Sequence, residues 1–317
     1  MEARLSPSST MRLLEIDALC KNNEKLLCKL REWKLIPSEP NYLCKKCGGA
    51  LKLGMRDRSI DGWQWRCTSY VSERKQKRKF CGYQVAFRSG TFFAQSRLSI
   101  FQILGFVRMW VFNLPLMYIG DELLISGQHT LVDWASFCRE VMLCSFMDNM
   151  EQLGGEGKIV EIDESKFGKR KYNRGKFVDG QWVFGGYERG TGRVFLVPLQ
   201  MVRLMKLYFE YMYIYIFQVN HSITFKDPDS GAHTNSIEST WRAAKVISSG
   251  AGRKKTSIAG NLAKYMFQKR CRDRNVDCMD EFLIMAGRLY DVTVERPPNS
   301  LPSLEDGAID SEDDYEC

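Results

Sequence analysis

Residues 158–199 constrain the fold more than any other stretch, because they predict three short strands joined by turns. In the first strand, Glu161 and Asp163 share a face with Ile159. Burying a carboxylate on an apolar strand costs free energy, so Asp163 requires a partner or solvent. A divalent metal ion is one such partner, and a solvent-facing position is the alternative. The strands are expected over Ile159–Ser165, Gln181–Tyr187 and Arg193–Pro198.

Four cysteines in the first third of the chain predict a zinc-binding ribbon. Cys44 and Cys47 flank two residues and precede a glycine pair, a pattern that is typical of a zinc knuckle. Cys67 and Cys81 would complete the ligand set, although the thirteen residues between them form an unusually long, basic insert. With eleven cysteines and no secretory leader in the first twenty residues, we expect a reducing compartment and zinc rather than disulfides. Unpaired cysteines are the alternative.

A pair of helices follows the ribbon. Leu116–Ser126 and Thr130–Met142 predict a helix-turn-helix with Thr130 as the N-cap of its second helix. An ordinary helical hairpin is the alternative interpretation. The second helix is expected to present Asp133, Ser136 and Arg139.

The C-terminal third predicts three helices. Trp241 and Val246 are expected to anchor the first one to the rest of the protein. Residues 256–292 predict the other two, with an apolar face formed by Leu262, Tyr265 and Met266. The expected basic face comprises Lys264, Lys269, Arg270, Arg272 and Arg274.

The charge is unevenly distributed along the chain. In total, 46 Lys and Arg face 38 Asp and Glu, a net charge of +8. Residues 305–317 hold seven of the acids and no cation, so the remainder has 46 cations against 31 acids, or +15. A basic body predicts a polyanionic partner, with the acidic tail as a competing or solvating arm. The most apolar window, residues 201–217, is interrupted by charges, so we expect no membrane span.

Three segments form a specific set: VEIDESKFGKRKYNRG, VFGGYERGTGRVFLVPL and VNHSITFKDPDSGAHTNSIESTWRAA. Together they resemble the Merlin superfamily of DDE transposases and the related bacterial ISXO group, over roughly residues 44–290. The resemblance implies a ribonuclease-H-like core in which acids hold two Mg²⁺ or Mn²⁺ ions against a phosphodiester. By this resemblance, Asp163 is the first catalytic aspartate and Glu238 is the last catalytic acid. Glu238 has an alternative role in a capping box with Asn235 as the N-cap.

The family's middle aspartate has no counterpart here. Residues 200–218 contain no aspartate, and a strand–helix–strand unit alone takes about 30 residues, so the acid is deleted together with its strand. We therefore expect catalysis to be lost. An active transposase that recruits another acid is one alternative, although Asp227 and Asp229 lie in a segment that the family has in addition to its middle aspartate. A defective gene copy or an incomplete splice form is the other.

Clustered cations beside the candidate acids predict a surface that contacts DNA phosphates, with a solvated charge run as the alternative. The family resemblance also favours DNA recognition by the helix-turn-helix. Double-stranded DNA is thus the expected partner, and a second copy of the chain is a further candidate. The predicted DNA-binding residues are Lys166, Lys169, Arg170, Lys171, Arg174, Lys176, Arg253, Lys254 and Lys255.

Taken together, these features predict an α+β multidomain protein with structural Zn²⁺ and ancestral Mg²⁺ or Mn²⁺. The expected location is the nucleus in a eukaryote and the cytoplasm otherwise. The predicted units are an N-terminal helix (1–40), a zinc ribbon (41–95), a helical DNA-binding region (96–152), a truncated ribonuclease-H-like α/β core (153–292) and an acidic disordered tail (293–317).

Overall fold

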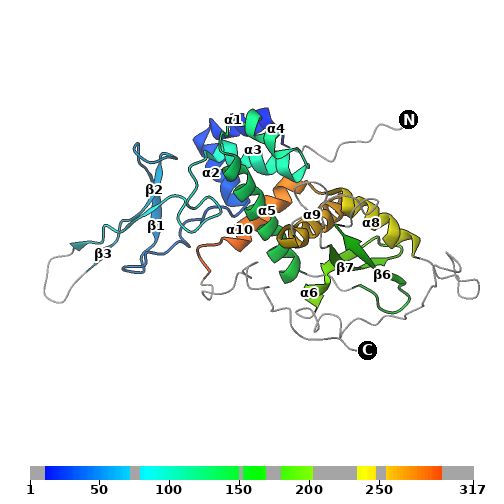
Figure 1. The fold of residues 1–317 in the computed structure, drawn as a ribbon. Coiled ribbons are helices and arrows are strands. Elements are labelled where there is room, and N and C mark those ends of the chain that lie inside the picture. Colours follow the sequence, from blue (N-terminus) through cyan, green and yellow to red (C-terminus); the bar gives the residue numbers. More distant parts are fainter. Residues whose placement is uncertain are drawn as a thin grey trace, which may run out of the picture.

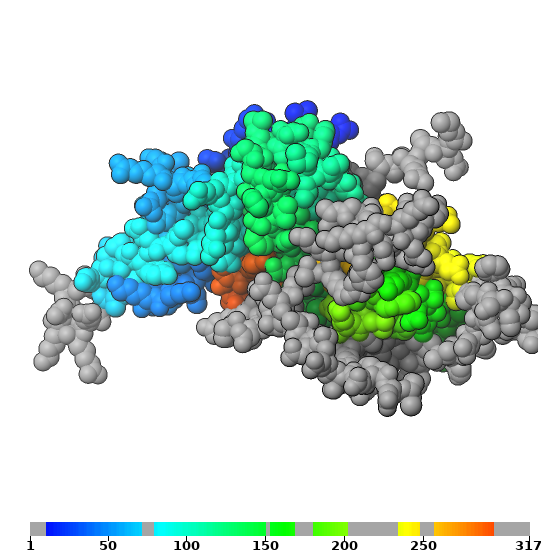
Figure 2. All heavy atoms as spheres, viewed as in Figure 1, coloured from blue at the N-terminus to red at the C-terminus, as the bar shows by residue number. Residues whose placement is uncertain are grey.

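The computed structural model combines helices and sheets in an α+β architecture. A small antiparallel ribbon lies at one end, a helical body in the middle and a three-stranded sheet at the other end (Figure 1). The space-filling view shows the same order, with the green helical column between the blue ribbon and the yellow-green sheet region (Figure 2). The structure describes residues 11–71, 79–149, 153–168, 180–202, 234–247 and 255–294.

The ribbon is built around a small core of aromatic and cysteine side chains. Trp65 is 1% exposed, and its ring meets that of Tyr42 edge-on, with centroids 5.2 Å apart. Three strands pair antiparallel in the order β1-β2-β5, and β3 pairs with β4 in a separate hairpin. The strands are β1 (Leu51–Met55), β2 (Trp63–Cys67), β3 (Tyr70–Val71), β4 (Lys79–Phe80) and β5 (Gln84–Ala86).

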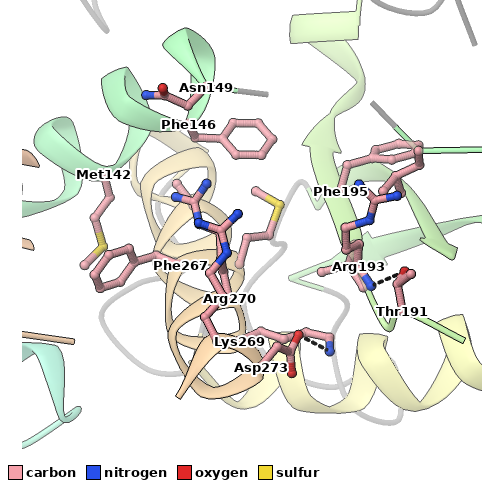
Figure 3. Close-up of a pocket in the computed structure, with 15 residues that line it drawn as sticks. Met142, Phe146, Asn149, Thr191, Arg193, Phe195, Phe267, Lys269, Arg270 and Asp273 are labelled. Atoms are coloured by element: carbon pink, nitrogen blue, oxygen red, sulfur yellow. Dashed lines mark hydrogen bonds and ion pairs between the residues drawn. The ribbon is translucent and has the colours of Figure 1, made fainter. Parts of the chain in front are cut away.

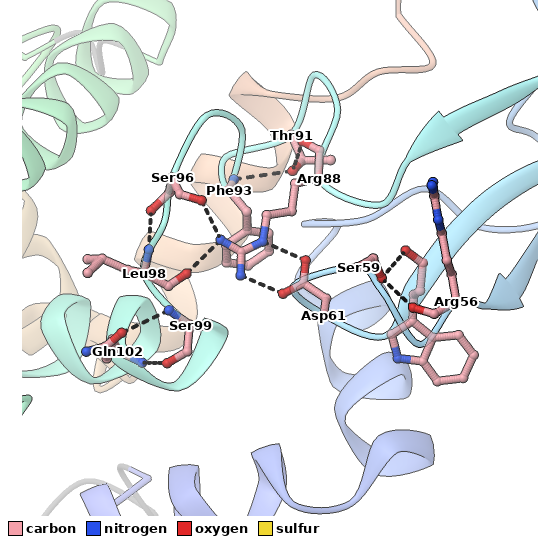
Figure 4. Close-up of polar contacts among 11 residues, drawn as sticks. Arg56, Ser59, Asp61, Arg88, Thr91, Phe93, Ser96, Leu98, Ser99 and Gln102 are labelled. Atoms are coloured by element: carbon pink, nitrogen blue, oxygen red, sulfur yellow. Dashed lines mark hydrogen bonds and ion pairs between the residues drawn. The ribbon is translucent and has the colours of Figure 1, made fainter.

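A buried ion pair joins the ribbon to the segment that leads into the helical body (Figure 4). Arg88 donates from Nη2 and Nε to the two carboxylate oxygens of Asp61, at 2.5 and 2.7 Å. Its remaining nitrogen, Nη1, donates to the carbonyl oxygens of Ser96 and Leu98. Both side chains of the pair are less than a tenth exposed, so this two-pronged contact fixes the path of the chain between ribbon and helices.

The helical body draws on both ends of the chain. One continuous apolar cluster includes Ile16, Leu30, Phe106 and Trp134 from the N-terminal half and Phe282 from the C-terminal half. The expected single N-terminal helix is instead two helices, because Asn22 accepts a hydrogen bond from the Lys25 amide and starts a second one. The helices are α1 (Leu13–Cys20), α2 (Asn23–Glu32), α3 (Ile100–Val111), α4 (Leu116–Glu122), α5 (Gln128–Asp148), α9 (Lys255–Arg274) and α10 (Cys278–Leu289).

Helix α9 is covered on two sides, which corrects the expected basic face at Lys264. Leu262, Tyr265 and Met266 form a buried apolar face as predicted, and this face packs toward the sheet, while Phe267 packs into the helical body. Lys264 is 6% exposed; its Nζ donates to the Trp110 carbonyl oxygen at 2.6 Å and lies 3.8 Å from the Trp110 ring centroid. Burial lowers the Lys264 pKa to about 7.

The predicted three-stranded sheet is confirmed, with strand ends shifted by one or two residues. The antiparallel order is β6-β7-β8, and Asp163 lies opposite Gly185. Trp241 packs against the sheet as predicted, but Val246 is 68% exposed because five residues along a helix turn it about 140° away. The elements are β6 (Val160–Phe167), β7 (Gln181–Glu188), β8 (Val194–Pro198), α6 (Leu199–Val202) and α8 (Asn235–Ile247).

Candidate functional site

The four predicted cysteines converge in the ribbon. Their sulfur atoms all lie within 4.8 Å of one another. The Sγ atoms of Cys44 and Cys81 are 3.7 Å apart, and those of Cys47 and Cys67 are 3.4 Å apart. Tetrahedral zinc with Zn–S distances of about 2.3 Å places its sulfurs about 3.8 Å from each other. The cluster therefore has the size and the chemistry to hold a metal ion.

Local backbone structure brings these cysteines together. Cys44 and Cys47 lie on a tight turn in which the Gly48 amide donates to the Cys44 carbonyl oxygen. Gly48 has a φ of +70°, which a residue with a side chain rarely adopts. A Cβ on Gly49 would lie 2.1 Å from the Ser69 Oγ, so the turn must pass close to the segment after Cys67.

Hydrogen bonding favours the thiolate form of one cysteine, Cys67, and the protonated form of another, Cys47. At Cys47 a hydrogen bond from the Gly49 backbone lowers the pKa, but hydrogen bonds with the other three thiols outweigh it, so that the pKa rises to about 12. Burial raises the pKa of Cys67, but hydrogen bonds from the Ser69 backbone and side chain and from the neighbouring thiols outweigh it, so that the pKa falls to about 7. The Lys46 amide also points at the Cys44 sulfur, at 3.4 Å. Thiolates are the form in which cysteines bind metal ions.

Asp163 lies on the face of β6 that α8 covers. The Trp241 indole Nε1 donates to its Oδ2 at 2.9 Å, and the carboxylate is partly buried. Gly185 makes this packing possible, because a Cβ there would lie 2.5 Å from the Trp241 ring. Asp163 was predicted either to bind a metal ion or to face solvent. The described contacts show neither, because the carboxylate is partly buried and no other acids converge with it among the described residues.

Glu161, which the sequence analysis did not single out, is the carboxylate that meets the start of α8. Its Oε2 accepts hydrogen bonds from the Ser236 and Ile237 amides, at 2.9 and 3.0 Å. Its Oε1 accepts from the Arg189 Nε at 2.7 Å, and the side chain is 1% exposed. A carboxylate at the positive end of a helix satisfies amides that have no partner within the helix. In the sequence, the available signal for the contact between Glu161 and α8 was that Glu161 lies two residues before Asp163 and so shares its face of the strand.

Glu238 lies on the first turn of α8 with its side chain exposed. The expected N-cap is wrong by one residue: the helix starts at Asn235, the Glu238 amide donates to the Thr234 carbonyl oxygen, and Glu238 Oε1 lies 3.3 Å from Thr234 Oγ1. In the part of the chain that the structure describes, the four cysteines are the only group of three or more candidate ligands. Asp163 and Glu238 are thus not joined there by a third acid.

Most of the predicted phosphate contacts lie outside the described residues. Lys166 is described; it is exposed on β6, and its Nζ lies 5.8 Å from the Trp182 ring centroid. Lys255 begins α9, and its side chain is not described. Lys169, Arg170, Lys171, Arg174, Lys176, Arg253 and Lys254 fall outside the described ranges, as do Asp227, Asp229, residues 203–218 and the acidic tail from residue 295.

The surface of the predicted helix-turn-helix carries few cations. Helix α5 begins at Gln128 with Gly127 as N-cap, so Thr130 lies inside the first turn and is not the cap. Arg139 is the only Lys or Arg between residues 116 and 143. It packs across Gly260 of α9, where a Cβ would lie 2.6 Å from the Arg139 Cβ, and so faces the protein. This helix pair therefore presents no Lys or Arg side chain toward solvent for contact with phosphate.

The ribbon, by contrast, presents a basic surface that the sequence analysis did not assign to DNA. Its described residues between 41 and 86 hold seven exposed cations and one exposed acid, Asp57. The other acid in this range, Asp61, is buried against Arg88. In the sequence, the excess of Lys and Arg over Asp and Glu in this range was the available signal for a basic surface. The seven cations, named the ribbon cations, are Lys45, Lys46, Lys52, Arg56, Arg58, Arg66 and Lys79.

No helix in the described ranges has the length and apolarity that a bilayer crossing requires. No family model, curated protein or solved structure matches the chain.

Proposed function

We propose that this chain is a DNA-binding protein descended from a DDE transposase, with a structural zinc ribbon and a ribonuclease-H-like core that has lost strand cleavage. The observation that carries the proposal is the contact between Trp241 and Asp163, which are 78 residues apart. Both belong to segments on which the resemblance rests. The contact supports the proposal because Asp163, the proposed first acid, lies beneath the helix that bears Glu238, the proposed last acid.

Zinc is the metal we assign to the four cysteines. Four buried or half-buried thiols with sulfur separations of 3.4 and 3.7 Å fit a tetrahedral thiolate site. A structural ion of this kind fixes the turns that carry its ligands, so it would hold the ribbon cations in place without taking part in a reaction.

Loss of cleavage is part of the same proposal. Two-metal phosphoryl transfer requires several carboxylates that converge on ions about 3.5–4 Å apart. Asp163 already accepts a hydrogen bond from Trp241, and Glu238 is exposed beside Thr234. These two acids support at most a weakly held Mg²⁺ or Mn²⁺ ion.

DNA contact is assigned first to the ribbon and to the cations next to β6. The affinity for duplex DNA should fall steeply with salt, with a log–log slope of about −0.9 for each phosphate contact. A triple variant, Lys45→Ala, Lys52→Ala and Arg66→Ala, should make this slope shallower by up to about 2.7. Fluorescence anisotropy over a salt series measures the effect.

Lys21→Ala is the matched control, because Lys21 is an exposed cation of the helical body that pairs with Asp17. The control should keep the slope of the unaltered protein. An affinity that does not change with salt would contradict DNA binding, and an unchanged slope in the triple variant would remove the ribbon from the interface.

A further inference from the structure

A cavity of about 460 Å³ lies where the helical body meets the sheet. In Figure 3, Phe146 of α5 and Arg270 of α9 lie on its helical side, facing Phe195 and Arg193 of the sheet side. Phe146 packs against three separate apolar clusters, so its position is fixed from several directions. Ligand sites for small molecules have volumes of about 300–1,000 Å³, and this cavity falls in that range.

One part of the cavity wall is aromatic and rigid. Phe195 and Phe267 are 2% and 4% exposed, and the Phe195 ring packs against that of Phe184 at a centroid distance of 5.5 Å. Phe146 is only half-buried, so part of its ring is open to the cavity. A wall of this kind suits a flat, weakly polar group, because ring stacking requires a fixed aromatic face.

The other part of the wall is cationic. Arg193, Lys269, Arg270 and Arg274 line the cavity, against one acid, Asp273. Lys269 pairs with Asp273 at 3.0 Å, and Arg193 pairs with Glu188 at 2.7 Å. These pairs offset the charges of Lys269 and Arg193, and Arg270 is the cation of this wall on which the inference rests. Guanidinium groups bind phosphate oxygens through two parallel hydrogen bonds.

A flat ring beside a phosphate is the chemistry of a nucleotide. We propose that this cavity binds an unpaired nucleotide, with its base against Phe146 and its phosphate at Arg270. The nucleotide has two possible sources, a free mononucleotide or the unpaired end of a DNA strand; the second source rests on the DNA-binding function proposed above. The cavity is lined mainly by residues of α5, α9 and β8 and by none of the ribbon cations, so it would add to duplex binding without replacing it.

The test compares the full chain bound to a blunt duplex and to the same duplex with a short 5′-phosphorylated overhang. Stacking of one base contributes about 1–3 kcal/mol, so the overhang should raise the affinity by about tenfold. Phe146→Ala and Arg270→Glu should remove this gain and leave blunt-duplex affinity within about twofold. Phe146→Leu and Arg270→Lys are included because they preserve the apolar volume and the charge, and they should keep part of the gain.

Arg242→Glu is the matched control, since Arg242 is an exposed arginine of α8 outside the cavity lining. It should leave the ratio of the two affinities unchanged. A second arm measures deoxyadenosine monophosphate by ligand-observed NMR, with a signal that Arg270→Glu abolishes. If the mononucleotide binds but the overhang does not raise the affinity for the duplex, the cavity binds free nucleotides.

The outcomes separate the two proposals. Salt-dependent binding of the blunt duplex, with no overhang gain and no mononucleotide signal that depends on Phe146 and Arg270, would overturn the cavity proposal and keep the DNA-binding function. A mononucleotide signal lost in Arg270→Glu, together with no duplex binding at any salt concentration, would support the cavity and overturn the DNA-binding function.

Discussion

Two regions, the ribbon and the junction of β6 with α8, each carry a predicted set of metal ligands, and the two sets differ in what surrounds their polar atoms. In the ribbon, the four sulfur atoms face one another, and the Sγ atoms of two pairs are 3.4 and 3.7 Å apart. In the second set, the indole of Trp241 binds Asp163, and Glu238 is exposed on α8 beside Thr234. The four sulfurs converge on a common point, whereas Asp163 and Glu238 each contact a separate group.

This difference shows why candidate ligands alone do not define a metal site. An ion needs donors that converge and that are not already satisfied by the protein. The four sulfur atoms of the ribbon converge in this way. The carboxylates of β6 instead fix α8 on the sheet, because Glu161 binds the amides at the start of the helix and Asp163 binds a side chain one turn further along.

The largest expected effect is loss of the ribbon metal. Cys47→Ser removes one of four thiolates, and structural zinc contributes about 10–16 kcal/mol of apparent binding free energy to small domains of this kind. The zinc content should fall from about one ion per chain to near zero, and the ribbon should unfold. Elemental analysis and amide NMR spectra of freshly reduced protein measure both effects.

Cys28→Ser is the matched control, because Cys28 is an exposed thiol of α2 outside the cluster. It should keep the metal. In the Cys47→Ser variant, signals from the helical body should persist, since its core includes none of the four cysteines. Unaltered protein without zinc would contradict the site.

A smaller effect is expected from Glu161→Ala, which tests whether this carboxylate is structural. The change leaves the Ser236 and Ile237 amides and Arg189 without their carboxylate partner, which should lower the free energy of unfolding by about 3 kcal/mol. Chemical denaturation monitored by tryptophan fluorescence gives this value. Glu164→Ala is the control, because Glu164 is exposed on the same strand and should change stability by less than about 0.5 kcal/mol.

Acid should weaken the same sheet through Glu188. Burial opposes its charge, but hydrogen bonds from Thr191, Arg193 and the Gly154 amide lower its pKa from 4.5 to about 2. Because the folded-state pKa lies below the unfolded value, the stabilisation is complete above about pH 4.5 and is lost as the pH falls toward about 2. Denaturation midpoints measured from pH 6 downward should drop in this window. Glu188→Gln should flatten this dependence, and an equal drop in that variant would assign the effect to other groups.

The sequence predicted regular features well and tertiary contacts poorly. The strand pattern of residues 158–199 and the four cysteines both emerged as expected, because alternation and ligand spacing are local properties. The burial of Lys264 did not, since it depends on a second surface that packs against α9. The role of Glu161 was missed for the same reason: its partners lie 28, 75 and 76 residues away along the chain.

The smallest expected effect is that Asp163→Ala does not change DNA cleavage, because the unaltered chain should not cleave. Asp163 is held by Trp241, and among the described residues no third acid lies with it and Glu238. The assay uses duplexes that carry terminal repeats from the same genome, with Mg²⁺ or Mn²⁺. Cleavage that disappears in Asp163→Ala would show that β6 carries a working metal site, and the contrast with the ribbon would then fail. If the contrast holds, cleavage that depends on Asp163 should appear only after the missing segment is restored from an intact relative, because only that segment would supply a carboxylate that converges with Asp163 and Glu238.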